Sequence, residues 1–312
     1  MKTSIEAAPL VRCALNGPTM GTRYAAVLFA PEGMATDPLA AALFDAVDRV
    51  DWQMSTWKPD SDLNRLNAAP VGEWVAIPRE LMTVLAEALK IGRATKGAFD
   101  IGVGGLVSAW GFGPGTRQPD RLRIAAASER PRAPTMEALQ LDVTTSRARK
   151  AAPLTLDLSG IAKGFGVDEM ARVMDAFGIR SWLVGIDGEM RARGLKPDGT
   201  PWAVAHERPD RHSREAMGVI ELTDMAVATS GNYRHWVEMD GTLLSHTMDP
   251  GTHRPIANGI ASVSVLATTC MTADAWATAF MVLGAEAARR LAADLGMGTI
   301  FVFDDGTVSS TI

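Results

Sequence analysis

Residues 154–184 narrow the choice of fold more than any other stretch of the chain. Leu154–Leu158 has the apolar run of a short buried strand, Gly160 interrupts it, and Lys163–Phe177 follows with helical periodicity. Ser181–Val184 is again a strand-like apolar run. A strand, a glycine turn, a helix and a second strand in this order predict a βαβ crossover or a related α/β unit. We therefore expect a mixed α/β fold.

Other segments favour the same fold class. Helical periodicity and β-rich apolar runs alternate along the chain, with helices predicted over 38–52, 78–95, 272–283 and 285–295, and strands over 20–29, 219–222, 225–229, 262–267 and 298–302. With 47% hydrophobic residues in 312, the chain has enough apolar side chains for a large core. Residues 1–312 are expected to form a single domain, with two closely packed lobes as the alternative.

Composition disfavours several classes of function. A net charge of -5 gives no strong basic field for nucleic acid or an anionic membrane surface, so neither is an expected partner. The two cysteines, Cys13 and Cys270, make neither a disulfide framework nor a zinc site. No apolar run is long enough for stable membrane insertion, and the first 18 residues do not have the pattern of a signal peptide or lipobox. A cytoplasmic protein is expected, or an exported one if a leader was removed.

Asp274 and Thr278 are four residues apart in a predicted helix, so their side chains share one face. Two oxygen ligands placed in this way suit a hard cation such as Mg²⁺. Both residues also have ordinary structural roles, because a carboxylate favours the first turn of a helix and a threonine can bond back to a carbonyl. Spacing alone favours those structural roles.

Two further segments could contribute to a site. In Asp157–Gly164 a glycine turn precedes a helix, so backbone N–H groups and Lys163 could bind a phosphate, although neither a Walker A loop nor a dinucleotide fingerprint is present. His246, before an Asp-Pro-Gly turn, could accept a proton from a hydroxyl. Each pattern also occurs for purely structural reasons: a glycine can serve turn geometry alone, and most histidines of this kind are on the surface or satisfied.

The order of these segments is more specific than any one of them. The chain resembles the ApbE family, the FAD:protein FMN transferases, and the matching segments cover nearly its whole length in family order: Met20-Gly21-Thr22, Met54-Ser55-Thr56-Trp57, Gly97-Ala98-Phe99-Asp100, Asp157 through Gly164, Ala228-Thr229-Ser230-Gly231, Ser245-His246 with Asp249-Pro250, and Ala273-Asp274-Ala275 with Thr278.

The resemblance implies a fold, a site and a reaction. The family fold is an α/β sandwich similar to a T-fold, with FAD in a deep cleft. The positions that match FAD-contacting residues are Met20, Trp57, Ala98, Phe99, Asp100, Asp157, Lys163 and Met248. Those that match Mg²⁺ ligands are the side chains of Asp274 and Thr278 and the carbonyls of Gly160 and Ala277, and His246 matches the base.

The implied reaction joins the FMN half of FAD to a threonine or serine of an acceptor flavoprotein, in a short Asp-x-x-Thr/Ser-type motif, and releases AMP. Two alternatives remain open on the sequence: an FAD pyrophosphatase that gives FMN and AMP, and a non-catalytic FAD-binding protein. The chain departs from the family at Gly185-Ile186-Asp187-Gly188-Glu189, where relatives commonly have Gly-Gly-Asp. Asp187 replaces a glycine there, whereas Glu189 keeps the carboxylate.

Overall fold

The computed structural model describes residues 9–115, 118–129, 133–211, 213–234 and 236–312. Its centre is an eight-stranded sheet whose paired strands are all antiparallel. In spatial order the strands are β1 (Leu10–Thr19), β2 (Thr22–Pro31), β6 (Ser181–Ile186), β7 (Glu189–Arg193), β10 (Ala226–Gly231), β15 (Ile260–Ala267), β16 (Gly298–Phe303) and β17 (Val308–Ser310).

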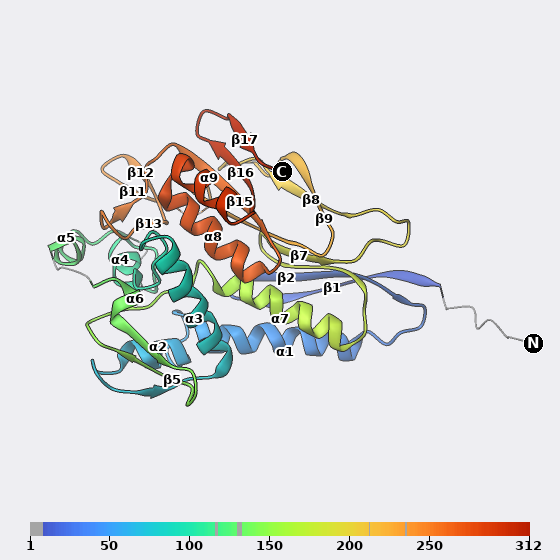
Figure 1. Ribbon diagram of the computed structural model, residues 1–312, viewed down its shortest axis with the longest axis horizontal. Coiled ribbons are helices and arrows are strands. Elements are labelled where there is room, and N and C mark those ends of the chain that lie inside the picture. The colour runs from blue at the N-terminus through green and yellow to red at the C-terminus, as the bar shows by residue number, and fades with distance from the viewer. Residues whose placement is uncertain (1–8, 116–117, 130–132, 212, 235) are drawn as a thin grey trace, which may run out of the picture.

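Helices cover one face of this sheet (Figure 1). They are α1 (Asp37–Met54), α7 (Ala162–Ala176), α8 (Cys270–Leu283) and α9 (Ala285–Asp294), and α3 (Arg79–Ala94) packs against α1 and α8. Alternate residues of a strand point to opposite faces, and β2 follows this rule. Ala26 and Leu28 pack with α1 and α7, whereas Val27 and Phe29 belong to a separate apolar cluster on the other face.

That second face is covered by the hairpin of β8 (Trp202–Glu207) and β9 (Ala216–Leu222). Trp202 and Leu222 pack there against Ala192 and Val227 of the sheet. The result is a layered mixed helix and sheet structure, so the predicted fold class is confirmed.

Smaller elements gather beyond one end of the sheet (Figure 1). The helices among them are α2 (Asp62–Ala68), α4 (Gly104–Ala109), α5 (Arg121–Glu129) and α6 (Thr135–Ala138). The strands are β3 (Val75–Ala76), β4 (Leu139–Asp142), β5 (Arg147–Lys150), β11 (Trp236–Met239), β12 (Thr242–Ser245), β13 (Met248–Asp249) and β14 (Arg254–Pro255). Among the described residues no helix has both the length and the apolarity to cross a bilayer.

The prediction of a βαβ crossover over residues 154–184 was wrong. Residues 154–158 form no strand of the sheet and make a single parallel bridge, between Thr155 and Val103. The side chain of Asn67 instead binds both backbone groups of Leu156, accepting from its N–H at 2.7 Å and donating to its carbonyl at 3.0 Å. A distant side chain thus supplies the hydrogen bonds that a neighbouring strand would have made.

The strand predicted over residues 20–29 is instead the second strand of a hairpin and begins at Thr22. Met20 and Gly21 form the two-residue turn between β1 and β2, with φ of 47° and 72°, rather than the start of one strand. Two residues at positive φ are typical of a type I′ hairpin, whose twist matches its strands. Residues 1–8, part of the stretch in which no leader was predicted, lie outside the described residues.

Candidate functional site

A cavity of about 250 Å³ opens where the glycine-rich turns meet the start of α7 and the middle of α8. Of the thirteen residues predicted for the site, those whose side chain or backbone lines it are Ala98, Phe99, Asp100, Asp157, Gly160, Lys163, His246, Met248, Asp274 and Thr278. They come from four separate segments of the chain.

Three predicted residues do not line this cavity. Met20 is in the β1–β2 turn, where its side chain packs near Gly166 of α7. Trp57 precedes α2 and is 56% exposed. The side chain of Ala277 is fully buried in α8, although a ligand role was predicted only for its carbonyl.

Lys163 stands at the polar end of the cavity, among carboxylates. Its Nζ is 2.6 Å from Oε1 of Glu189 and 3.9 Å from Oδ2 of Asp187. Asp187 and Gly188 form the tight turn between β6 and β7, where Asp187 has a φ of 55°. Aspartate tolerates this left-handed conformation, so it can stand where the resemblance implies a glycine. The substitution adds a half-exposed carboxylate to the cavity wall.

Asp274 is the second buried carboxylate of the cavity. It is 4% exposed, and its Oδ2 accepts the backbone N–H of Gly164 at 2.9 Å. Burial, together with the charge of Glu189, raises the pKa of Asp274 to about 7. Burial also raises the pKa of Glu189, even though Lys163 opposes the shift.

When Glu189 and Asp274 are both ionised, the cavity holds an excess of buried negative charge. Burial lowers the pKa of Lys163, but Glu189, Asp274 and Asp187 outweigh it and hold that pKa above its usual value. One ammonium therefore faces two buried carboxylates. Within the described part of the chain, Oε2 of Glu189 is buried without a hydrogen-bond partner. A cation would offset this excess, since buried charges are costly unless paired.

Thr278 lies close to the backbone of Gly160. A Cβ built on Gly160 would be 2.9 Å from Oγ1 of Thr278, so only glycine leaves the hydroxyl in place. The same hydroxyl is 3.0 Å from Oγ of Ser230, on β10. Carboxylate, hydroxyl and carbonyl oxygens are the donors that Mg²⁺ prefers. No group of three or more His, Cys, Asp or Glu that could hold a metal occurs among the described residues, so any metal here relies on such a mixed donor set.

Asp100 and Asp157 shape the turns that border the cavity. Asp100 accepts the backbone N–H of Gly102 at 2.7 Å and that of Thr135 at 3.2 Å, and it also binds the Thr135 hydroxyl. Asp157 accepts the N–H of Ser159 at 2.8 Å. Both carboxylates therefore hold backbone in place at the positions where the resemblance predicts contact with FAD.

His246 directly follows β12 and lines the side of the cavity next to α4. Its ring meets that of Phe112 edge-on, with centroids 6.2 Å apart. Met248, two residues on, packs with Leu106 and Trp110. His246 and Met248 thus connect an aromatic and apolar cluster to the cavity that Lys163 also lines.

The sequence patterns gave no sign of one group of cavity residues. Arg234 forms an ion pair with Glu207 and lies 4.9 Å over the ring of Tyr233, and all three line the cavity. Arg234 and Glu207 are 27 positions apart: Glu207 ends β8, whereas Arg234 lies between β10 and β11. No local spacing connects them, so only the tertiary structure could have found this pair.

The fold and cavity define a mixed helix and sheet protein in which a partly exposed lysine pairs with a buried carboxylate beside apolar side chains. The chain belongs to the ApbE family, whose model matches residues 20–301. It is similar to the FAD:protein FMN transferases of Vibrio cholerae, at 41% identity over 89% of this chain and 83% of that protein, and of Klebsiella pneumoniae, at 34% over 94% and 84%.

Solved structures agree with this membership. The flavin transferase ApbE from Vibrio cholerae superposes with a TM-score of 0.85 at 37% identity, covering 97% of both chains. The apo flavinyl transferase ApbE from Pseudomonas stutzeri gives 0.83 at 35% identity, over 97% of this chain and 95% of that one.

Proposed function

We propose that this chain catalyses Mg²⁺-dependent transfer of FMN from FAD to a threonine or serine hydroxyl of an acceptor flavoprotein, with release of AMP. Flavin transfer from FAD to an acceptor follows from the family and from relatives that carry this activity in their names. One observation carries the chemistry: Lys163, His246, Asp274 and Thr278 line the same cavity.

The residues present fit a magnesium ion. Asp274, Thr278 and the carbonyls of Gly160 and Ala277 would hold it, all through oxygen, beside a buried excess of negative charge. Bound Mg²⁺ would neutralise the pyrophosphate of FAD and the charge that develops on the departing phosphate.

The chain's own groups account for the remaining chemistry. Lys163 places a positive charge beside the pyrophosphate, where it stabilises the negative charge of the transition state. His246 accepts the proton of the acceptor hydroxyl, whose oxygen then attacks the FMN-side phosphorus. The bond between the two phosphates breaks and AMP leaves, so that FMN is joined to the acceptor by a phosphoester bond. Phe99 and Met248, which line the cavity, are suited to flat, apolar parts of the substrate.

The acceptor is a protein with an Asp-x-x-Thr/Ser-type motif. The test incubates this protein with FAD and Mg²⁺, with and without a small FMN-binding acceptor domain that carries the motif. AMP release and acceptor mass are measured, and an acceptor with its threonine changed to valine is the matched control. We expect an acceptor mass gain equal to FMN, with one AMP per transfer, and EDTA should block both.

Other outcomes would change the assignment. AMP and free FMN without a mass gain would identify a pyrophosphatase. Bound FAD without any AMP would identify a binding protein and remove the catalytic proposal. Modification of the valine control would place the transfer on another residue.

A further inference from the structure

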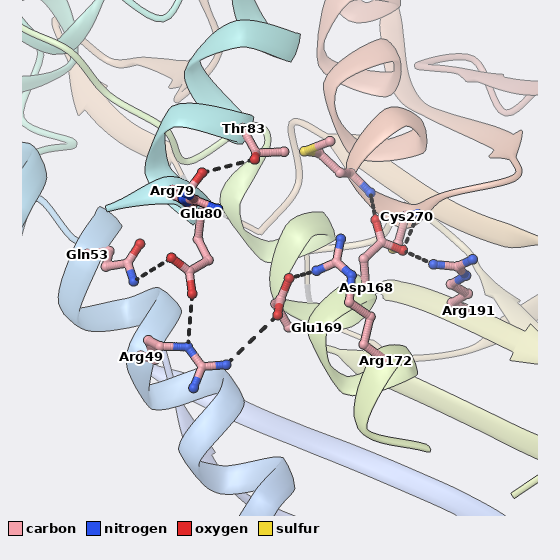
Figure 2. Close-up of polar contacts among 11 residues, drawn as sticks. Arg49, Gln53, Arg79, Glu80, Thr83, Asp168, Glu169, Arg172, Arg191 and Cys270 are labelled. Carbon is pink, nitrogen blue, oxygen red and sulfur yellow. Dashed lines mark hydrogen bonds and ion pairs between the residues drawn. The ribbon is translucent and has the colours of Figure 1, made fainter. Parts of the chain in front are cut away.

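Asp168 is a buried carboxylate on α7 that does not line the cavity, and it binds the start of α8 (Figure 2). Its Oδ1 accepts the backbone N–H of Cys270 at 2.9 Å, and its Oδ2 accepts that of Met271 at 2.9 Å. The first N–H groups of a helix have no partner within the helix. Asp168 therefore completes the N-terminus of α8 from a different helix.

The local cap of α8 does not replace these two bonds. Thr269 accepts the N–H of Thr272 through its hydroxyl and that of Ala273 through its carbonyl. Cys270 and Met271 are thus the two N–H groups of the first turn that Thr269 does not bind. A carboxylate at this point also interacts favourably with the positive end of the helix dipole.

A second contact joins the same two helices one turn away. Gly164 donates its N–H to Asp274 at 2.9 Å, whereas Asp168 binds Cys270. Gly164 and Asp168 are four residues apart on α7, and Cys270 and Asp274 are four apart on α8, so each pair shares a helix face. The two helices are therefore antiparallel, and hydrogen bonds join them on two successive turns. A Cβ on Gly164 would be 2.7 Å from Cβ of Asp274, so the helices touch too closely there for any side chain.

Strand β7 is also joined to α7, through two ion pairs. Arg191 Nη1 is 2.6 Å from Oδ1 of Asp168, and Glu189 Oε1 is 2.6 Å from Nζ of Lys163. Glu189 and Arg191 are two residues apart on the strand and so point to the same face of the sheet. The ion pairs Arg191–Asp168 and Glu189–Lys163 therefore both connect β7 to α7.

We propose that Asp168 is a positioning residue for the cation site: by clamping the start of α8 against α7, it sets where Asp274 and Thr278 stand in the cavity. The inference rests on the proposed function, because it takes those two side chains as Mg²⁺ ligands. Residues that orient metal ligands without touching the metal commonly change metal affinity about 10–100-fold when they are replaced.

The neighbouring Glu169 provides a matched control. It is also a buried acid of α7, but its carboxylate turns the other way, toward Arg49 at 3.9 Å and Arg172, as Figure 2 shows. Glu169→Gln therefore removes a carboxylate and its ion pairs from the same helix without touching α8. A purely stabilising role for Asp168 would make the two variants alike.

The test measures binding of Mg²⁺ alone to wild type, Asp168→Asn and Glu169→Gln, by calorimetry and by the shift in Tm, with no FAD present. Asn replaces one acceptor by a donor, so it cannot accept both amides. We expect Asp168→Asn to weaken Mg²⁺ binding about 10–100-fold, with faster hydrogen exchange at the amides of Cys270 and Met271. Transfer at saturating Mg²⁺ should return close to the wild-type kcat. Glu169→Gln should bind Mg²⁺ as the wild type does.

Two results would overturn this inference. If Asp168→Asn binds Mg²⁺ as tightly as the wild type, or if Glu169→Gln weakens binding equally, the clamp does not position the site. A wild type that does not bind Mg²⁺ would instead remove the metal from the proposed function itself. Should Asp168→Asn fail to fold, Arg191→Gln removes the ion pair that holds the Asp168 carboxylate against the two amides, and it must weaken Mg²⁺ binding in the same direction.

Discussion

Nζ of Lys163 lies 2.6 Å from Oε1 of Glu189, a carboxylate with only 3% of its side chain exposed. The two residues come from the start of α7 and the start of β7. Removal of one partner of a buried ion pair leaves the other charge unpaired, which costs more than the pair itself contributes. Lys163 therefore stabilises the fold, in addition to the role proposed for it beside the pyrophosphate of FAD.

Lys163→Met should destabilise the metal-free protein by about 3 kcal/mol, because Glu189 and Asp274 then have no cation beside them. Urea denaturation in EDTA measures this, and Mg²⁺ should recover part of the loss. The control is Lys90→Met, which removes an exposed pair with Glu87 on α3 and should cost less than about 1 kcal/mol. Equal stability of the two variants would contradict the prediction.

Gly160→Ala should lower Mg²⁺ affinity about 10–100-fold. The new methyl group would be 2.9 Å from Oγ1 of Thr278, so the hydroxyl has to move away from its place beside Ser230. Titration with Mg²⁺ measures the change. Gly105→Ala is the control, since a Cβ there has no atom within 4 Å, and unchanged affinity in both variants would remove Thr278 from the ligand set.

Asp274 makes the stability of the metal-free protein depend on pH. Its pKa is about 7 in the folded protein, against an ordinary value of 3.8, mainly because it is buried and then because of Glu189. The folded state thus holds a proton that the unfolded state has lost between about pH 4 and about pH 7, and this contribution to the free energy of unfolding falls as pH rises through that window. Asp274→Asn should flatten this part of the stability profile.

The affinity for Mg²⁺ should also depend on the ionisation of Asp274, but it should increase with pH, whereas the stability of the metal-free protein decreases. The metal binds the ionised form, so its affinity increases as pH rises toward about 7 and levels off above it. The Mg²⁺-induced rise in Tm, measured at about pH 6 and about pH 8, should be larger at the higher pH and absent in Asp274→Asn. A pH-independent rise would place the metal elsewhere.

His246→Ala should retain FAD binding and slow transfer about 10²–10⁴-fold, the usual effect of losing a general base. FAD affinity is measured by fluorescence titration and transfer by acceptor mass. His253→Asn is a nearby control, because His253 is in the following turn and does not line the cavity. Full activity of His246→Ala would assign proton removal to another group.

Local periodicity was enough to predict the main helices, of which α7 and α8 carry cavity residues. The predicted helices 38–52, 78–95, 163–177 and 272–283 correspond to α1, α3, α7 and α8, because each depends on contacts within a few turns. The resemblance likewise predicted ten of the residues that line the cavity, as their motifs lie in order along the chain. Their chemical roles stay predictions until the variants above are measured.

The errors and omissions arose where distant residues meet. Leu154–Leu158 has the composition of a strand, yet Asn67, 89 positions from Leu156, takes up its backbone bonds. Nothing in the sequence joins Arg234 to Glu207, or Asp168 to the start of α8. The contact of Trp57 with FAD stays a prediction, since its side chain is exposed and does not line the cavity.

The sequence by itself determined the helical and strand periods, the family and the kinds of side chain available for chemistry. Only the tertiary structure decided which of them are buried together. Lys163 meets Glu189 across 26 positions, and Gly164 meets Asp274 across 110. Periodicity reports only contacts between near neighbours in the chain, whereas burial and shifted pKa values depend on which distant groups exclude water from one another.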